Sequence, residues 1–233
     1  MKNYFLFCLI SFFCLYFNVA QTHEIKEDQI NTILKKFILE NPDLIEKSLI
    51  NYSKIKEKKE FETSIKNLKT IQNPTISGKN SDVIIYEFFD YNCGYCKSVV
   101  PGMLEVFNED KRISIVFVEL PILHETSIKA ALAALSAHQQ KKYLEFHINL
   151  MKHKGRIDEK VLFKIAKNIN LNISQFKKDF SNTELMSMVD RNRMIAKKLK
   201  LNGTPAFVIG KKIYPFAMKK EELVKAINIA RKE

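Results

Sequence analysis

The residues best suited to chemistry in this chain are two cysteines in a Cys-Gly-Tyr-Cys segment at residues 93–96. The sequence contains four cysteines, but Cys8 and Cys14 lie in an apolar run near the N-terminus. A thiolate at the start of a helix is stabilised by unpaired backbone N–H groups and by the helix dipole. We therefore expect Cys93 to be the nucleophile and Cys96, one helical turn later, to be the resolving thiol.

Zinc binding and a purely structural disulfide are alternative uses of this pair. A closed zinc site needs four ligands, and the sequence has neither a second C-x-x-C nor a close pair of histidines. A disulfide across two residues closes too short a loop to add much stability through chain entropy. The sequence therefore favours redox chemistry with no metal and no cofactor beyond a Cys93-Cys96 disulfide. Gly94 and Tyr95 are expected to set how strongly the thiolate is stabilised.

Glu87 is the second residue whose type and place suggest chemistry. It interrupts the apolar run 83–89, which is typical of a strand covered on both faces. A buried carboxylate without a partner tends to have a raised pKa, which suits a proton acceptor near Cys96. The alternative is a glutamate at the strand edge that reaches solvent.

Other polar and sulfur-containing residues are weaker candidates. The histidines of the C-terminal half have no partner in the sequence that would give them catalytic geometry, and methionines at helical spacing usually belong to a core. The residues in question are His124, His138, His147, His153, Met186, Met188 and Met194.

The N-terminus resembles an export signal. Lys2 precedes the apolar run 4–17, which is shorter than the roughly 20 apolar residues of a membrane span. We expect a signal peptide over residues 1–20, with an uncleaved anchor as the alternative. Cleavage would leave 213 residues with a net charge of +11. The mature protein is then expected to be soluble and periplasmic, in an oxidising compartment where disulfides persist.

The basic character of the chain does not by itself indicate a nucleic-acid partner. The 38 Lys and Arg residues exceed the 26 Asp and Glu residues, but lysines alternate with acids, as in residues 56–60 and 219–222. There is no arginine-rich cluster and no aromatic nucleic-acid motif. A solvated basic surface is the favoured interpretation.

Residues 24–72 are predicted to form an N-terminal helical extension, within a segment bounded at 21–75. Apolar residues recur at helical spacing on both sides of Asn41-Pro42, where the pattern stops and restarts. A thin apolar stripe on a long charged helix cannot bury itself. We expect the extension to form a homo-oligomer, with packing on its own chain as the alternative.

The rest of the chain alternates between strand and helix patterns. A linker at 73–82 precedes strands and helices expected at 83–89, 93–109 (with a kink at Pro101), 113–118, 128–151, 158–168, 174–179, 184–200, 206–209, 213–216 and 221–231. This order predicts an α/β sheet with helices on its faces and a helical insertion at about 124–201.

Three segments in this order resemble the DsbA-like branch of the thioredoxin superfamily. They are Phe88 to Lys97 around the cysteines, Pro121-Ile122-Leu123, and Gly203-Thr204-Pro205. The resemblance implies a thioredoxin-like fold over 76–233, interrupted by the helical insertion. It also implies a cis Pro205 opposite the cysteines, a Thr204 backbone that pairs with an extended substrate, and Glu87 as a buried acid.

Two features resemble disulfide isomerases more than the best-known DsbA oxidases. The Gly94-Tyr95 dipeptide and Thr204 are similar to those of DsbC-type isomerases, which are dimers. The extension at 24–72 is similar in character to that of the trimeric ScsC-like proteins.

The expected function is therefore an exported protein thiol–disulfide oxidoreductase, with oxidase and isomerase activity both open. Its expected partners are substrate proteins with cysteines and a membrane redox partner that reoxidises or reduces the site. A non-enzymatic helical binding protein with a structural disulfide is the rival from another class.

Overall fold

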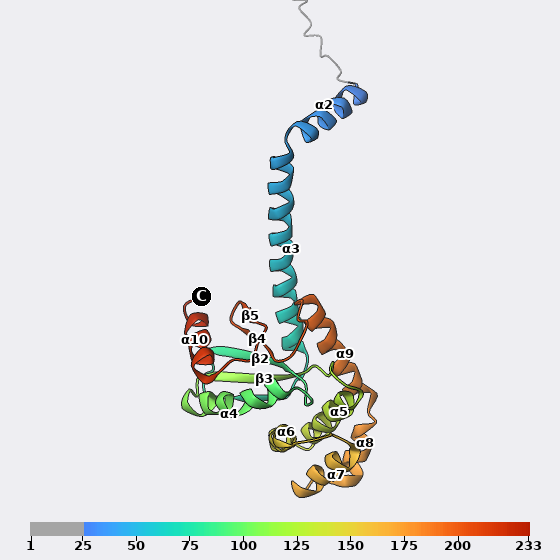
Figure 1. The fold of residues 1–233 in the computed structure, drawn as a ribbon, viewed down its shortest axis with the longest axis vertical. Coiled ribbons are helices and arrows are strands. Elements are labelled where there is room, and N and C mark those ends of the chain that lie inside the picture. The colour runs from blue at the N-terminus through green and yellow to red at the C-terminus, as the bar shows by residue number, and fades with distance from the viewer. Residues whose placement is uncertain (1–25) are drawn as a thin grey trace, which may run out of the picture. The chain divides into compact units, whose positions relative to one another are not determined.

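The computed structural model describes residues 26–233, so the predicted signal peptide lies outside the described residues. The chain divides into two compact units at Lys56/Glu57, which we describe separately. Figure 1 labels the helices and strands of both units. Among the described residues, no helix is both long enough and apolar enough to cross a membrane.

The first unit contains α2 (Glu27–Glu40) and the first half of α3 (Pro42–Thr70). The helices are separated at Asn41, as predicted from proline's preference for the first helical position. No residue of α2 is buried. The exposed large apolar side chains of this unit are Ile30, Ile33, Leu34, Phe37, Ile38, Leu39, Leu44, Leu49, Ile50, Tyr52 and Ile55.

The second unit begins at Glu57 and includes the last turns of α3. Ser64 and Leu68 of this helix are buried, and so is Ile71 just after it. The C-terminal part of the expected 21–75 extension therefore packs with the unit that carries the cysteines.

A five-stranded mixed sheet forms the centre of this unit. β2 and β3 are parallel, and the other neighbouring pairs are antiparallel. The spatial order β1-β3-β2-β4-β5 comprises Thr75–Ser77, Ile113–Glu119, Val83–Phe89, Ala206–Ile209 and Lys212–Tyr214. The strand β1 was not predicted from the sequence; it is a three-residue edge strand within the expected linker.

Helices cover both faces of the sheet, as the apolar β2 sequence predicted. Ile85 and Phe89 point into a core shared with α4 (Gly94–Glu109) and α10 (Lys220–Ala230). Tyr86 and Phe88 point into a second core, shared with α9 and the end of α3. Pro101 lies inside α4, which stays a single helix.

The helical insertion lies between β3 and β4, as expected. It comprises α5 (Glu125–Gln139), α6 (Tyr143–Lys152), α7 (Glu159–Asn168), α8 (Ile173–Phe180) and α9 (Thr183–Lys198). The prediction of one helix over 128–151 was wrong. The chain breaks at 140–142, where Lys141 has a φ of 59° and the Gln140 side chain bonds the backbone of Asn172 at the start of α8.

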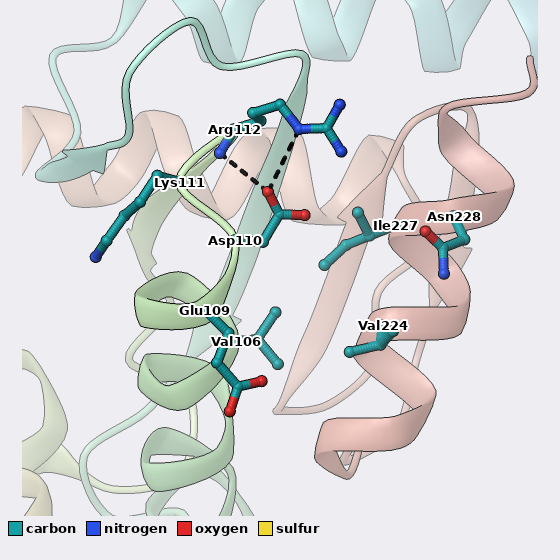
Figure 2. Close-up of a pocket in the computed structure, with 8 residues that line it drawn as sticks. All are labelled: Val106, Glu109, Asp110, Lys111, Arg112, Val224, Ile227 and Asn228. Atoms are coloured by element: carbon teal, nitrogen blue, oxygen red, sulfur yellow. Dashed lines mark hydrogen bonds and ion pairs between the residues drawn. The ribbon is translucent and has the colours of Figure 1, made fainter.

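A hollow of about 540 Å³ opens at the C-terminal end of α4 (Figure 2). Its apolar lining comes from α4 and α10, and its charged lining comes from residues 109–112. Asp110 there is paired with Arg112 and Arg231. The hollow lies at the opposite end of α4 from the cysteines, so it plays no part in the site described next.

Candidate active site

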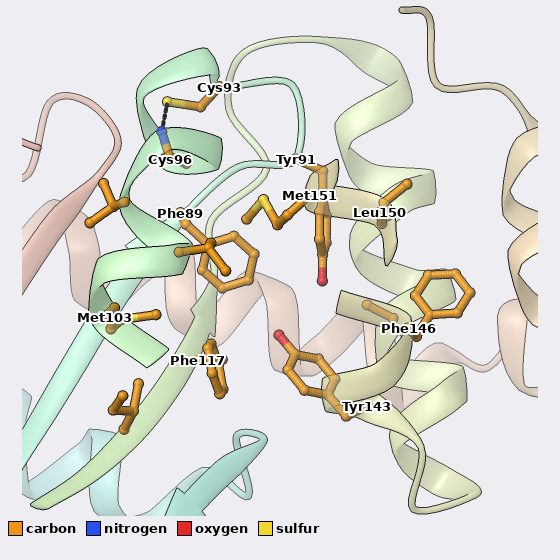
Figure 3. Close-up of a cluster of buried hydrophobic side chains, with 14 of the residues drawn as sticks. Phe89, Tyr91, Cys93, Cys96, Met103, Phe117, Tyr143, Phe146, Leu150 and Met151 are labelled. Atoms are coloured by element: carbon orange, nitrogen blue, oxygen red, sulfur yellow. Dashed lines mark hydrogen bonds between the residues drawn. The ribbon is translucent and has the colours of Figure 1, made fainter. Parts of the chain in front are cut away.

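Cys93 is the N-cap residue of α4, one position before the first-turn place that the sequence suggested. Its Sγ accepts a hydrogen bond from the backbone N–H of Cys96 at 3.2 Å (Figure 3). As a thiol it also donates to the carbonyl oxygen of Thr204 at 3.2 Å. Both cysteines are free thiols in this structure.

The surroundings of the two thiols separate their acidities. The Cys96 thiol is the largest influence on Cys93 and lowers its pKa to about 6; the Thr204 hydroxyl and the N–H groups of Cys96 and Tyr95 add to this. Burial of Cys93 acts in the opposite direction and raises this pKa. Burial raises the pKa of Cys96 well above its usual range, and the hydrogen bond to Cys93 raises it further. At neutral pH, Cys93 is therefore the thiolate and Cys96 the thiol.

The Thr204–Pro205 peptide bond is cis and lies directly before β4. Because β4 pairs with β2 through Ala206 and Phe88, the bond is held beside the segment that leads from β2 to the cysteines. The Thr204 hydroxyl is buried and makes no hydrogen bond among the described residues, so its proton is available to the Cys93 thiolate.

Gly94 and Tyr95 lie at the surface of this arrangement. A Cβ on Gly94 would meet no atom within 4 Å, and Tyr95 is 72% exposed. Cys93 itself is only 4% exposed. The dipeptide therefore shapes the face of the site without taking part in the core beneath it.

Glu87 is fully buried on β2, and neither carboxylate oxygen has a hydrogen-bond partner. Burial raises its pKa to about 8, and the charge of Cys93 contributes to the rise. This excludes the solvent-reaching alternative. A carboxyl group with this pKa can hold or accept a proton near neutral pH.

Asp90 organises the loop before Cys93, and sequence reasoning missed it. One carboxylate oxygen accepts from the backbone of Asn92 and from the Ser127 hydroxyl. The other accepts from the backbone N–H groups of Ile122 and Leu123. Asp90 thereby joins the active-site loop to the segment after β3 and to α5.

A buried polar cluster lies below the cysteines, and its acid, Glu119, was also missed. Glu119 Oε1 accepts from the hydroxyls of Tyr91 at 3.2 Å and Tyr143 at 2.8 Å. Figure 3 shows these two hydroxyls turned towards the same space. Tyr91 also contacts Nδ1 of His147 at 3.1 Å. The only signal in the sequence was a charged residue ending an apolar strand.

The histidines remain outside the site's chemistry. His147 is buried among Phe89, Phe117 and the two tyrosines, and burial lowers its pKa to about 3. His124 caps α5, and the carbonyl of His153 accepts from Lys97. Met188 is buried, whereas Met194 is exposed. Residues 26–233 contain no group of three or more acidic, His or Cys side chains arranged to hold a metal ion.

The family model described as Thioredoxin matches residues 69–229, which is more than half of the chain. The chain belongs to the DsbA-like branch of the thioredoxin superfamily. The match contains both cysteines, the helical insertion and the cis-proline. Sequence and fold therefore agree on the family that the three segments suggested.

Several solved structures are similar to this chain. A thioredoxin-like oxidoreductase from Silicibacter pomeroyi DSS-3 is 34% identical, with a TM-score of 0.68 over 71% of this chain and 96% of that one. The thiol-disulfide exchange protein alpha-DsbA2 from Wolbachia pipientis is 27% identical, with a TM-score of 0.70 over 74% and 95%. The catalytic domain of Proteus mirabilis ScsC is 26% identical, with a TM-score of 0.69 over 76% and 99%.

The curated relatives differ in length. A probable disulfide bond formation protein D from Bacillus cereus is 26% identical over 69% of this chain and 79% of its own length. The chain spans only about a fifth of a relative from Salinispora tropica named Na(+)/H(+) antiporter NhaA 3, at 23% identity over 56% of this chain.

Proposed function

We propose that this protein is an exported thiol–disulfide oxidoreductase that exchanges disulfides with substrate proteins through Cys93 and Cys96. The observation that carries the proposal is the placement of Cys93. Its sulfur lies at the start of α4, bonded to the Cys96 N–H and facing the Thr204 carbonyl beside a cis-proline. The similarity of this chain to the thiol-disulfide exchange protein from Wolbachia pipientis supports the same proposal.

In the oxidising direction, a substrate thiolate attacks Sγ of Cys93. A bond forms between the substrate sulfur and Cys93, the Cys93–Cys96 bond breaks, and Cys96 leaves as a thiolate that takes up a proton. A second substrate thiolate then attacks the sulfur of the first substrate cysteine. It forms the substrate disulfide and releases Cys93 as a thiolate, which its low pKa favours. Two electrons pass from the substrate to the protein.

In the reducing or isomerising direction, the Cys93 thiolate attacks a substrate disulfide, and Cys96 must lose its proton to resolve the mixed disulfide. Glu87 is the proposed acceptor of that proton, because it is a buried carboxyl whose charge acts on Cys96. The extended substrate is proposed to pair with the backbone of Thr204. A substrate N–H would then replace the Cys93 thiol as the donor to the Thr204 carbonyl oxygen.

Alkylation of the reduced protein tests this activity against the binding-protein alternative. Cys93 should react with iodoacetamide along a titration centred near pH 6, whereas an ordinary cysteine titrates near 8.5. Cys93→Ser should remove this reaction and all exchange with substrates. A titration centred near 8.5 would instead favour a structural role for the pair.

We propose further that the N-terminal helices assemble copies of the chain. Apolar side chains along α2, such as Ile30, Leu34 and Phe37, are exposed in the single chain. Covering them with the same helix of another copy would remove apolar surface from water. Sedimentation should show an oligomer that Leu34→Glu/Phe37→Glu dissociates. The matched control Lys35→Glu/Lys36→Glu changes charges on the same helix and should leave the oligomer intact.

Oligomerisation bears on whether the protein acts as an isomerase or an oxidase. The test is reactivation of scrambled ribonuclease by residues 21–233 and by residues 57–233, which begin where the second unit begins. Reactivation by the longer form alone would indicate an oligomeric isomerase. Fast oxidation of reduced ribonuclease without reactivation would indicate an oxidase, reoxidised by a membrane redox partner in the periplasm.

A further inference from the structure

A set of six basic side chains lies on the first turn of α4, on the loop between α6 and α7, and on α7. We call it the basic band, and its members are Lys97, Lys154, Arg156, Lys160, Lys164 and Lys167. Lys97 follows Cys96 directly, and its Nζ donates to the carbonyl of His153 at 2.9 Å. This bond holds the loop between α6 and α7, which carries Lys154 and Arg156, beside the first turn of α4.

A hollow of about 400 Å³ lies where the band passes the active-site loop. Its lining comes from the start of α5 and from residues 156–162. Thr126 on its wall accepts a hydrogen bond from the side chain of Asn92 at 3.1 Å, and Asn92 immediately precedes Cys93. The wall of the hollow is therefore bonded to the residue that precedes the proposed nucleophile in the chain.

The charges in this hollow do not cancel. Lys129 is paired with Glu159 at 2.6 Å, and Asp158 accepts from the backbone of Val161 as the cap of α7. Arg156 and Lys160 have no carboxylate within 4 Å in the part of the chain that is described. Its three cations therefore face two carboxylates, and the hollow carries a net charge of +1.

The band continues along one face of α7. Lys160, Lys164 and Lys167 follow the spacing that puts side chains on the same side of a helix, and Glu159 is the only acid on α7. All three lysines line a second hollow of about 380 Å³, together with Phe163. Lys160 and Lys167 are about 10 Å apart along the helix, which is about three residues of an extended chain.

We propose that the basic band binds acidic residues that flank the reactive cysteine of a substrate protein. This inference rests on the proposed function. The ammonium and guanidinium groups would pair with Asp and Glu side chains of an extended segment, while its cysteine faces Cys93. A polypeptide fits better than a flat anionic membrane surface, because the band begins beside the nucleophile and is hollowed at two places that admit single side chains.

The test uses three peptides, each with one cysteine activated as a 2-thiopyridyl disulfide. Three Asp, three Ser or three Lys residues flank the cysteine on each side. The Cys93 thiolate attacks the peptide sulfur, the peptide–thiopyridyl bond breaks, and thiopyridone absorbance reports the rate. At low ionic strength the Asp peptide should react about threefold or more faster than the Ser peptide, and the Lys peptide more slowly. High salt should bring the three rates together.

Charge reversal identifies the surface responsible. Lys154→Glu/Arg156→Glu/Lys160→Glu should remove or invert the order of the peptides while leaving the Ser peptide unchanged. Lys211→Glu/Lys225→Glu/Lys232→Glu is the control, because it makes the same charge change near α10, which packs against the far half of α4. Equal loss of preference in both variants would overturn the proposal in favour of a general field effect.

The remaining outcomes are also decisive. Equal rates for all three peptides would overturn the basic band but leave the proposed function intact. No reaction with the Ser peptide would instead count against the proposed function. Sedimentation with vesicles of phosphatidylglycerol, lost in the band variant, together with equal peptide rates, would replace the substrate by a membrane surface.

Discussion

Two buried glutamates on neighbouring strands differ in their hydrogen bonding. Glu87 on β2 and Glu119 on β3 are both almost completely buried and both face the core under α4. Glu87 has no hydrogen-bond partner, whereas Glu119 accepts from two tyrosine hydroxyls. Burial raises the pKa of both groups, but only Glu119 has donors that oppose the rise.

The difference separates a group kept for chemistry from one kept for structure. A buried polar group without a partner reduces stability, so Glu87 is maintained at the expense of the fold. Glu119 ties the loop residue Tyr91 and the α6 residue Tyr143 to the end of β3. Removing Glu87 should therefore increase the free energy of unfolding, and removing Glu119 should decrease it.

The Glu87→Gln substitution should have the largest effect. It should change how the free energy of unfolding depends on pH. The pKa of Glu87 is raised from 4.5 to about 8 in the fold. The fold is therefore most stable below pH 4.5, where Glu87 is protonated, and loses stability as pH rises from 4.5 to about 8. The variant should lack this loss and gain on the order of 4 kcal/mol relative to the wild type between pH 4.5 and 9. Urea unfolding of the reduced proteins measures the gain, with exposed Glu62→Gln as the control. A constant difference across this range would contradict the assignment.

Replacement by leucine should give opposite signs at the two glutamates. Glu119→Leu leaves the Tyr143 hydroxyl buried without an acceptor and leaves the Tyr91 hydroxyl with only Nδ1 of His147. It should lower the free energy of unfolding by about 3 kcal/mol. Glu87→Leu leaves no donor unpaired and should be neutral or stabilising at pH 7. Chemical denaturation measures both, and equal destabilisation would remove the distinction between the two sites.

A third buried group, His147 beside Tyr91, should respond to acid. Its pKa is lowered by burial to about 3, so the stability it supports is present above its unfolded value near 6.5 and is lost as pH falls. As pH falls from 6.5 to 5, the free energy of unfolding of His147→Phe should fall by about 2 kcal/mol less than that of the wild type. Parallel pH profiles for the two proteins would show that burial does not lower the pKa of His147.

The smallest expected effect comes from removing one hydroxyl of the cluster. Tyr143→Phe keeps the ring and deletes one of the two donors to Glu119, and should lower stability by about 1 kcal/mol. In a double-mutant cycle with Glu119→Leu, the two changes should be clearly non-additive. Full additivity would mean that the 2.8 Å contact contributes little.

Local features of the sequence predicted much of this molecule. The C-x-x-C spacing located the redox pair, and the almost continuous apolar run around Glu87 predicted a strand covered on both faces. The contacts of Asp90 and Glu119 could not be predicted, because they join residues up to 37 positions apart that share no periodic pattern. The break at Lys141 has no glycine or proline to mark it and depends on tertiary contacts between α5 and α8.

The openness of the fold around Gly94 bears on how this protein can evolve. Gly94 occupies the first helical position, where proline is well accepted, and an added Cβ there lies in open space. Tyr95 projects into solvent. Mutations at these two positions can therefore change the reduction potential of the thiols with little effect on the stability of the fold. Selection can explore oxidising and reducing variants here without first having to restore stability elsewhere.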